Sequence, residues 1–204
     1  MKTILITGGA GFIGSNLCKK LLNENNYIIC LDNLFSGNIQ NIEDLQNNPN
    51  FTFINHDIIN TITINQNIDE IYHLACPASP KSYQSDPLFT LQTCFTGTYN
   101  VCKLASEKNA KVLFSSTSEI YGDPLINPQH EKYWGNVNSV GIRSCYDEGK
   151  RIGETILVEF NRNKSLQIQI ARIFNTYGPN MSPSDGRVIT NFISQHIQNK
   201  DITI

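Results

Sequence analysis

Residues 2–14 read KTILITGGAGFIG, and this stretch decides the fold. Lys2 to Thr7 form a short apolar run that ends at glycines, which is typical of a buried strand followed by a turn. From Phe12 to Leu22 the apolar residues recur at helical spacing. The stretch therefore predicts a strand, a glycine-rich turn and a helix, which together form the first unit of an α/β chain.

A glycine turn between a strand and a helix is the setting that a dinucleotide fingerprint requires. Gly8, Gly11 and Gly14 fit its three roles, namely a tight turn, close approach of the backbone to a pyrophosphate, and close packing of helix on strand. The pyrophosphate would then lie at the helix N-terminus, where free N–H groups point toward it. Glycines also mark ordinary strand-to-helix turns, so the motif alone leaves both interpretations open.

Asp32 strengthens the dinucleotide interpretation because it closes the second apolar run, at residues 27–31. A carboxylate there can accept hydrogen bonds from the adenosine ribose. The alternative is a simple turn residue before Asn33. Together the glycines and Asp32 favour a dinucleotide. Since a carboxylate would repel a 2′-phosphate, we expect NAD rather than NADP.

The rest of the chain continues the same alternation. Near-continuous apolar runs separated by helix-length segments indicate a parallel sheet covered on both faces, a Rossmann-like doubly wound α/β fold. The further strands are predicted at residues 27–31, 51–55, 68–75, 111–115 and 166–173. Two long helices are predicted at residues 88–108 and 144–163, with an ordered, functional loop at 121–143.

The composition of the 204-residue chain narrows the class of partner. Sixteen Lys and Arg against 18 Asp and Glu give a net charge of −2, without a basic cluster for nucleic acid or an anionic membrane. No apolar run approaches the roughly 20 residues that span a bilayer, and a strand begins at Lys2, so we expect a cytoplasmic protein without a signal peptide. Six cysteines without a CxxC pair and four histidines without ligand spacing favour free thiols and no metal.

Two polar clusters mark a candidate catalytic end. Tyr146 and Lys150 stand four residues apart on a predicted helix and so share one face, although such pairs also arise by chance. The ammonium and a positively charged nicotinamide would favour the phenolate, which could take a proton from an alcohol while hydride leaves for NAD. Ser115 to Glu119 (SSTSE) follows the fifth strand at its carboxyl end, where open α/β sheets bind ligands.

Seven stretches together resemble one known family, the UDP-glucuronate decarboxylases, also called UDP-xylose synthases, within the extended short-chain dehydrogenase/reductases. The first of them is shared with sugar-nucleotide epimerases and dehydratases, whereas HLACPASP, YWGNVN and RSCYDEGKR point more specifically to the decarboxylases. The stretches are TGGAGFIGSN (7–16), HLACPASP (73–80), SSTSEIYGDP (115–124), YWGNVN (133–138), RSCYDEGKR (143–151), ARIFNTYGP (171–179) and DGRVITNFI (185–193).

The resemblance implies a redox-neutral cycle on bound NAD. C4 of UDP-glucuronate is oxidised, the resulting β-keto acid loses CO2, and the 4-ketopentose is reduced to UDP-xylose. By position, Tyr146 would be the acid/base, Lys150 its electrostatic partner and a ribose ligand, and Thr117 a hydrogen-bond donor to the C4 oxygen. Ser118 and Glu119 would govern the decarboxylation.

The resemblance also assigns binding positions. Asp57 ends a strand where adenine edges lie, and Arg187 could pair with a phosphate as a fork, although a solvated arginine at a helix start is the plainer alternative. Substrate contacts match Tyr83, Glu119, Asn175, Thr176 and Arg187. Cofactor contacts match Gly8, Gly11, Phe12, Ile13, Gly14, Asp32, Asn33, Phe35, Ser36, Gly37, Asp57, Ile58, Leu74, Thr93, Tyr146 and Lys150.

The chain departs from the family in sequence and in length. It reads Gln92-Thr93-Cys94 where the family usually has Lys-Thr-Asn, and Ser106-Glu107 where a basic pair is common. Family chains continue past the strand that Asp201 to Ile204 would begin. We therefore expect an NAD-binding domain at 1–170, the start of an incomplete substrate-binding domain at 171–204, and activity impaired by truncation.

Two other functions stay open. The chain could be a degenerate, non-catalytic NAD-binding partner of a full-length relative, or a UDP-sugar 4,6-dehydratase or 4-epimerase that uses the same residues. By analogy with the superfamily we expect a homodimer, or pairing with a full-length relative, through the two long helices. Its face would comprise Leu88, Leu91, Val101 and Leu104, unless these residues cover the sheet instead.

Overall fold

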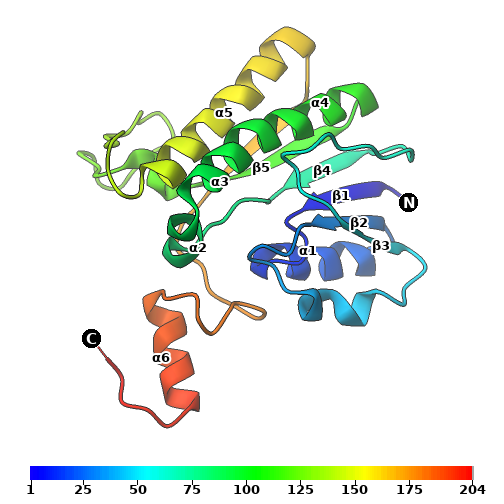
Figure 1. The fold of residues 1–204 in the computed structure, drawn as a ribbon. Helices are drawn as coiled ribbons and strands as arrows, with labels where there is room; N and C mark the ends of the chain where they lie inside the picture. Colours follow the sequence, from blue (N-terminus) through cyan, green and yellow to red (C-terminus); the bar gives the residue numbers. More distant parts are fainter. Residues whose placement is uncertain (204) are drawn as a thin grey trace.

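The computed structural model describes residues 1–203 and contains a six-stranded sheet in which all neighbouring strands are parallel. The strand order is β3-β2-β1-β4-β5-β6 (Figure 1), the doubly wound Rossmann-like order that the alternating pattern predicts. The predicted fold class is thus confirmed. The strands are β1 (Thr3–Thr7), β2 (Tyr27–Asp32), β3 (Phe51–Asn55), β4 (Glu70–His73), β5 (Lys111–Thr117) and β6 (Ile168–Ile173).

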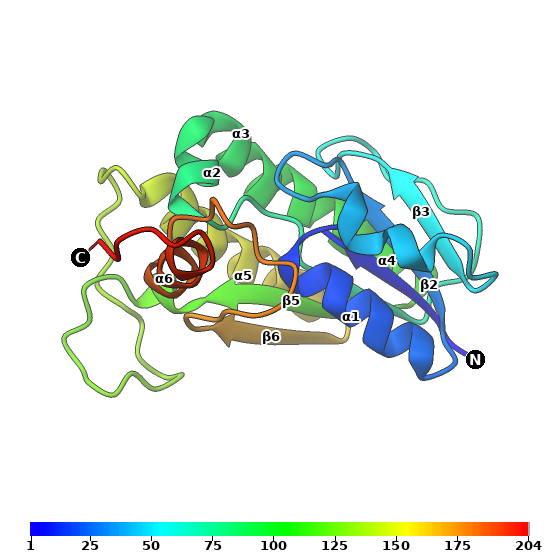
Figure 2. The same cartoon turned by 90° about the horizontal axis from the view of Figure 1, so that it is seen from below.

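Helices cover both faces of the sheet, as Figures 1 and 2 show. One face carries α1 (Phe12–Asn23) and the 3₁₀ segment η1 (Ile39–Leu45), and the other carries α4 (Thr98–Lys108) and α5 (Ser144–Lys164). Successive side chains of β1 point to opposite faces, so Ile4 and Ile6 join the core under α1 while Leu5 joins the core under α4 and α5. No helix within residues 1–203 is long and apolar enough to cross a bilayer.

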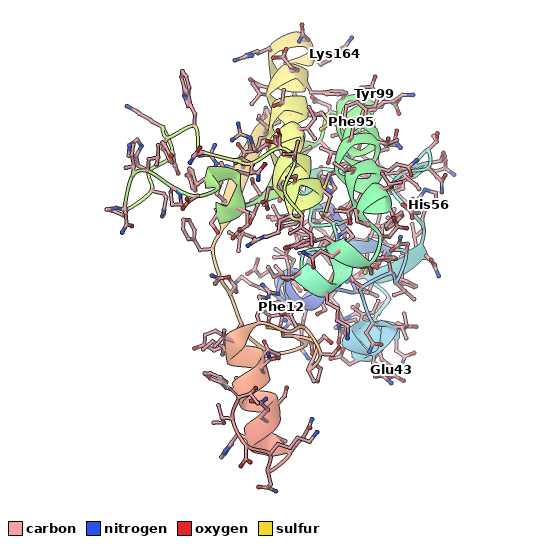
Figure 3. All side chains as sticks on the ribbon, turned by 60° about the vertical axis from the view of Figure 1, so that its left-hand side comes forward. Phe12, Glu43, His56, Phe95, Tyr99 and Lys164 are labelled. Carbon is pink, nitrogen blue, oxygen red and sulfur yellow. The ribbon has the colours of Figure 1, made fainter. Side chains whose placement is uncertain are left out.

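The helix predicted at 88–108 is interrupted by one wider turn. It consists of α3 (Pro87–Gln92), the π-helical segment η2 (Thr93–Gly97) and α4. Val101 and Leu104 are 0% and 3% exposed because they pack in the core between α4 and the sheet. They therefore do not belong to an outer dimer face. The outer surface instead carries Leu88, Leu91, Phe95 and Tyr99, the last two labelled in Figure 3.

The predicted loop at 121–143 has little regular structure but is held by hydrogen bonds to the short 3₁₀ segment η3 (Ser118–Tyr121) and to α5. It follows η3 and returns to it through a bridge between Gly122 and Asn136. Arg151 of α5 donates from Nη1 to the carbonyls of Ile120 and Trp134, at 2.9 and 2.8 Å. The loop is therefore ordered, as the sequence predicts.

Beyond β6 the chain leaves the sheet and ends in α6 (Val188–Ile197), which stands away from the other helices in Figure 1. Its apolar residues Val188, Ile193 and Ile197 are exposed. The strand predicted to begin at Asp201 does not form at 201–203, and Ile204 lies outside the described residues. No strand within the described range lies alongside this segment to pair with it, and a lone extended segment gains no ladder hydrogen bonds.

Candidate active site

A cavity of about 1020 Å³ runs along the carboxyl ends of the strands. It is centred where the strand order reverses between β1 and β4, the place where doubly wound sheets bind their ligands. Every site residue that the sequence predicts, from Gly8 of the glycine turn to Arg187 before α6, lies on its wall. The structure thus places the predicted nucleotide-binding residues and the predicted catalytic residues around one cavity.

The glycine turn packs closely on neighbouring backbone because its residues lack side chains. A Cβ on Gly8, whose φ is +72°, would lie 2.8 Å from the backbone nitrogen of Ala75. A Cβ on Gly14 would lie 2.1 Å from the carbonyl oxygen of Gly8. No side chain caps the start of α1 at Gly11, so its first N–H groups are available to an anion.

Asp32 ties this turn to β2. Its carboxylate is 6% exposed and accepts hydrogen bonds from the backbone N–H groups of Ala10 (3.0 Å) and Leu34 (2.8 Å). Burial raises its pKa, and the two backbone hydrogen bonds only partly offset this effect. A carboxylate has about four acceptor positions, so lone pairs remain for ribose hydroxyls.

The far end of the cavity is both polar and aromatic. Asn33 donates from Nδ2 to Oδ2 of Asp57 at 2.8 Å, while Oδ1 of Asp57 accepts from the backbone of Ile59. The rings of Phe35 and Phe89 lie 4.8 Å apart at the rim. Such a combination suits a flat heterocycle with polar edges.

Tyr146 and Lys150 meet the carboxyl end of β5, as the sequence predicts. Lys150 is 3% exposed, and its Nζ donates to the carbonyl of Ser115 at 2.7 Å and lies 5.9 Å from the centre of the Tyr146 ring. The Tyr146 ring stacks on Tyr83 with centroids 4.9 Å apart and an interplanar angle of 9°. The phenol therefore has a fixed orientation in the cavity wall.

The acidity of Tyr146 differs from the sequence-based expectation. Burial raises the pKa of its phenol above the ordinary 10.0, although the Lys150 ammonium and a hydrogen bond from Thr117 act in the predicted direction and lower it. Desolvation of the phenolate is the larger effect, so Lys150 only partly offsets the rise in the pKa of the Tyr146 phenol. Burial lowers the pKa of Lys150, but the charges of the neighbouring Cys76 and Tyr146 raise it by more. The pKa of Lys150 is therefore above its ordinary value.

Arg143 is a charged residue of the site to which the sequence analysis assigns no role. It stands just before α5 and forms an ion pair with Glu119 of η3, the segment that follows β5. The two side chains are about half and one-third exposed, and both line the cavity. Arg143 lies within the RSCYDEGKR stretch, three residues before Tyr146. This proximity in sequence is the signal that could have indicated a place for Arg143 in the site.

The predicted phosphate fork of Arg187 is occupied by another residue. Its Nε and Nη2 donate to the two carboxylate oxygens of Asp185, at 2.5 and 2.9 Å. An arginine two residues after an aspartate can form an ion pair with it. The sequence pattern DGR alone did not reveal this pairing. Arg187 still lines the cavity, with its guanidinium already paired.

The segment that follows β6 forms another wall and carries Asn175 and Thr176. It is attached to α1 by two hydrogen bonds, from Asn16 Nδ2 to the carbonyl of Pro179 (2.9 Å) and from Asn180 Nδ2 to Oγ of Ser15 (3.0 Å). Phe12, labelled in Figure 3, contributes a ring that a Cβ on Gly178 would approach within 3.2 Å. This wall therefore packs directly on the start of α1.

Comparison with known proteins places this geometry in a family. The sequence profile described as "NAD dependent epimerase/dehydratase family" matches residues 4–204. The chain belongs to this family. Its membership agrees with the doubly wound sheet, the glycine turn and the Tyr146–Lys150 pair.

Curated relatives of this epimerase/dehydratase chain carry a more specific name. It is 52% identical over 202 residues to "UDP-glucuronic acid decarboxylase 5" of Arabidopsis thaliana, covering 98% of this chain and 59% of the relative. It is 47% identical over 203 residues to "UDP-glucuronic acid decarboxylase 1" of Xenopus tropicalis, covering 100% of this chain and 48% of the relative. The chain thus spans about half to three-fifths of the length of these proteins.

Solved structures of the epimerase/dehydratase type share the fold closely. A UDP-N-acetylglucosamine 4-epimerase from Methanobrevibacter ruminantium matches with a TM-score of 0.89 and 29% identity, covering 98% of this chain and 64% of that one. A UDP-glucuronic acid 4-epimerase from Bacillus cereus, solved with UDP-glucuronic acid and NAD, matches with a TM-score of 0.85 and 30% identity, covering 99% and 65%.

NAD is the cofactor of this family, and the cavity fits it on its own evidence. Gly8 and Gly14 let the turn pack tightly on itself and on the segment after β4, and the start of α1 presents uncapped N–H groups at the cavity wall. Asp32 keeps acceptor capacity on the same wall. The residues present thus match a pyrophosphate flanked by a ribose.

Proposed function

We propose that the protein decarboxylates UDP-glucuronate to UDP-xylose through a 4-keto intermediate. The observation that carries this proposal is the identity of 47–52% to UDP-glucuronic acid decarboxylases over 98–100% of the chain. The epimerase and dehydratase structures with the same fold are only 25–30% identical. The reaction therefore follows the closer group, while the fold is common to both.

In the first step Tyr146 takes the proton of the C4 hydroxyl. Bound NAD supplies the chemistry that the side chains lack, since it accepts the C4 hydride and later returns it. Lys150 lies against the Tyr146 ring and stabilises the phenolate as it forms. We assign Thr117, which lies with Tyr146 on the cavity wall, to hold the C4 oxygen in line with the phenol.

Decarboxylation follows from the ketone itself. With a carbonyl at C4, the bond between C5 and the carboxyl carbon breaks, and its electron pair moves onto the C4 oxygen as an enolate. Tyr146 and Thr117 donate hydrogen bonds to that oxygen, and we assign Ser118 and Glu119 to the face where CO2 leaves and a proton arrives at C5. Reversal of the first step then returns the proton from Tyr146 to the C4 oxygen.

The remaining wall residues hold the two nucleotides. We assign the glycine turn, Asp32 and the pocket of Phe35 and Asp57 to NAD, and Tyr83, Asn175, Thr176 and Arg187 to the UDP-sugar. Arg187 would exchange the Asp185 carboxylate for a phosphate oxygen on binding, because both accept from the same fork. This exchange is compatible with the position of both residues on the cavity wall.

We further propose a homodimer or pairing with a full-length relative. An outer patch of Leu88, Leu91, Phe95 and Tyr99 supports it, since Leu88 is 78% exposed and Phe95 54% exposed. These residues line up along α3, η2 and α4 beside α5, where the T-shaped contact of Tyr99 with Phe160 joins the two helices. Burial of such a patch against a second helix pair would favour association.

The test is incubation with UDP-glucuronate and NAD, in one arm with the chain alone and in the other with the C-terminal region of an Arabidopsis relative added. We expect CO2 and UDP-xylose in equal amounts in at least one arm. UDP-galacturonate without CO2 would indicate an epimerase, and a 4-keto-6-deoxy sugar in a parallel incubation with UDP-glucose and NAD would indicate a dehydratase. NAD binding without turnover in either arm would favour a non-catalytic partner and refute the proposal.

A further inference from the structure

Two cysteine sulfurs lie in contact at the catalytic end of the cavity. Cys76 follows β4, Cys94 lies in η2, and their Sγ atoms are 3.3 Å apart. A disulfide bond is about 2.05 Å long, so the sulfurs need to approach by only a little more than 1 Å. The residues are 18 positions apart in the chain and come from segments on different walls.

The surroundings of the two thiols differ in a way that suits sequential oxidation. Cys76 is half-buried and is the one cysteine on the cavity wall within the described residues, so a small solute can reach it. Cys94 is 3% exposed and is enclosed by α5, because a Cβ on Gly149 would lie 2.9 Å from its sulfur. The accessible sulfur therefore has a sheltered partner in contact with it.

Local electrostatics activate Cys76 rather than Cys94. A hydrogen bond from the Cys94 thiol and the nearby Lys150 ammonium lower the pKa of Cys76 to about 7, although burial opposes them. The same hydrogen bond and burial raise the pKa of Cys94 well above its ordinary value. Since thiolates are the reactive form, Cys76 is the sulfur that reacts first at neutral pH.

We propose that Cys76 and Cys94 form a reversible redox modification site on the cavity wall, oxidised by a hydroperoxide to an intramolecular disulfide. The Cys76 thiolate attacks the peroxide, an S–O bond forms as the O–O bond breaks, and an alcohol or water leaves. The Cys94 sulfur then attacks the sulfenic acid, an S–S bond forms, and the hydroxyl leaves as water with the Cys94 proton. The peroxide gains two electrons and the two thiols lose them. A small-molecule thiol reverses the reaction by exchange.

The consequence for the cavity is a covalent link between two of its walls. The segment around Cys76 includes Ala75, which packs against Gly8, and η2 includes Thr93 on the cavity wall. Oxidation also removes the thiolate beside Lys150. This site does not depend on which sugar nucleotide the protein converts, so its test is independent of the proposed reaction.

The experiment treats the reduced chain with hydrogen peroxide, blocks remaining thiols with N-ethylmaleimide, and maps chymotryptic peptides by mass spectrometry. Cleavage after Tyr72, Tyr83, Phe89 and Phe95 places each sulfur in a peptide without another cysteine, residues 73–83 and 90–95. We expect these two peptides to appear linked, lighter by two hydrogens, before any other cysteine is modified. Dithiothreitol should restore both free thiols.

Two variants sharpen the result. In Cys94→Ser, Cys76 should stop at the sulfenic acid, which dimedone traps, and no linked peptide should form. Cys145→Ser is the matched control, because it keeps a donor to the Tyr83 carbonyl near the site and should leave the Cys76–Cys94 link intact. A link to a different cysteine, oxidation of Cys76 without a link in the unmodified chain, or Cys76 reacting no faster than the core residue Cys102 would each overturn the proposal.

Discussion

Replacing Tyr146 with phenylalanine should separate chemistry from folding. The change removes one phenol oxygen and keeps the ring that stacks on Tyr83 at 4.9 Å. Loss of a hydroxyl hydrogen bond costs about 1 kcal/mol, and relief from burying the hydroxyl offsets a similar amount. We therefore expect the free energy of unfolding to change by less than about 1 kcal/mol, and NAD affinity to stay nearly constant.

The effect on the reaction should be much larger, because the proposed mechanism assigns the C4 proton to Tyr146. General acid–base catalysis contributes about 10²- to 10⁴-fold, which corresponds to about 2.7 to 5.5 kcal/mol of activation free energy. The assay follows CO2 release and NADH absorbance with UDP-glucuronate, in whichever arm of the activity experiment turns over. Chemical denaturation and calorimetric NAD titration of the same preparation measure stability and binding.

Tyr121→Phe supplies the control for this prediction. Tyr121 is also a buried, stacked tyrosine, and its hydroxyl accepts from Arg172 at 3.0 Å outside the cavity. This variant should lose a comparable amount of stability but retain turnover. Full turnover in Tyr146→Phe, or an equal loss of turnover in Tyr121→Phe, would refute the acid/base role.

Three further changes test other parts of the site. Asp32→Ala should erode a preference for NAD over NADP, measured by calorimetry, and equal affinities in the unmodified protein would contradict the ribose assignment. Gly14→Ala should abolish NAD binding and lower the thermal midpoint, because the new Cβ would lie 2.1 Å from the Gly8 carbonyl oxygen. Burial raises the pKa of Asp147 from 3.8 to about 6, so the folded state holds its proton more tightly and stability falls as pH rises from about 4 to about 6. Asp147→Asn should remove this fall and be more stable by at most about 1 kcal/mol at about pH 7, since the half-exposed group is partly screened. Urea denaturation measures the difference, and no gain over the parent would contradict the prediction.

The sequence predicts the sheet well because its signals are local. A parallel strand is marked by a largely apolar run, so the edge strand β3 is found at its predicted bounds, although it is only partly buried. β2 and β5 extend their predicted bounds by one and two residues at the carboxyl end. Those added residues, Asp32, Ser116 and Thr117, are polar and close to the cavity, which is why hydrophobicity alone ended the strands early.

Features that depend on contacts between distant segments were harder to predict. Helical spacing did not reveal that Val101 and Leu104 face the sheet rather than a partner, because both faces of α4 carry apolar residues. Proximity in sequence showed the pairing of Tyr146 with Lys150, but not the burial that raises the phenol pKa. The contact of Cys76 with Cys94 requires the fold itself, since neither residue belongs to a recognisable cysteine motif.

The two hydrogen bonds between α1 and the segment after β6 link the halves of the cavity physically. The N–H groups of α1 that would hold the pyrophosphate directly precede Ser15 and Asn16, which hydrogen-bond Asn180 and Pro179. Any shift of the start of α1 on NAD binding alters the energy of the segment that bears Asn175 and Thr176. By linkage, the factor by which NAD changes affinity for the sugar nucleotide equals the factor by which the sugar nucleotide changes affinity for NAD. Weakening the Asn16 contact would thus lower the mutual dependence of the two ligands while sparing the groups that touch either one.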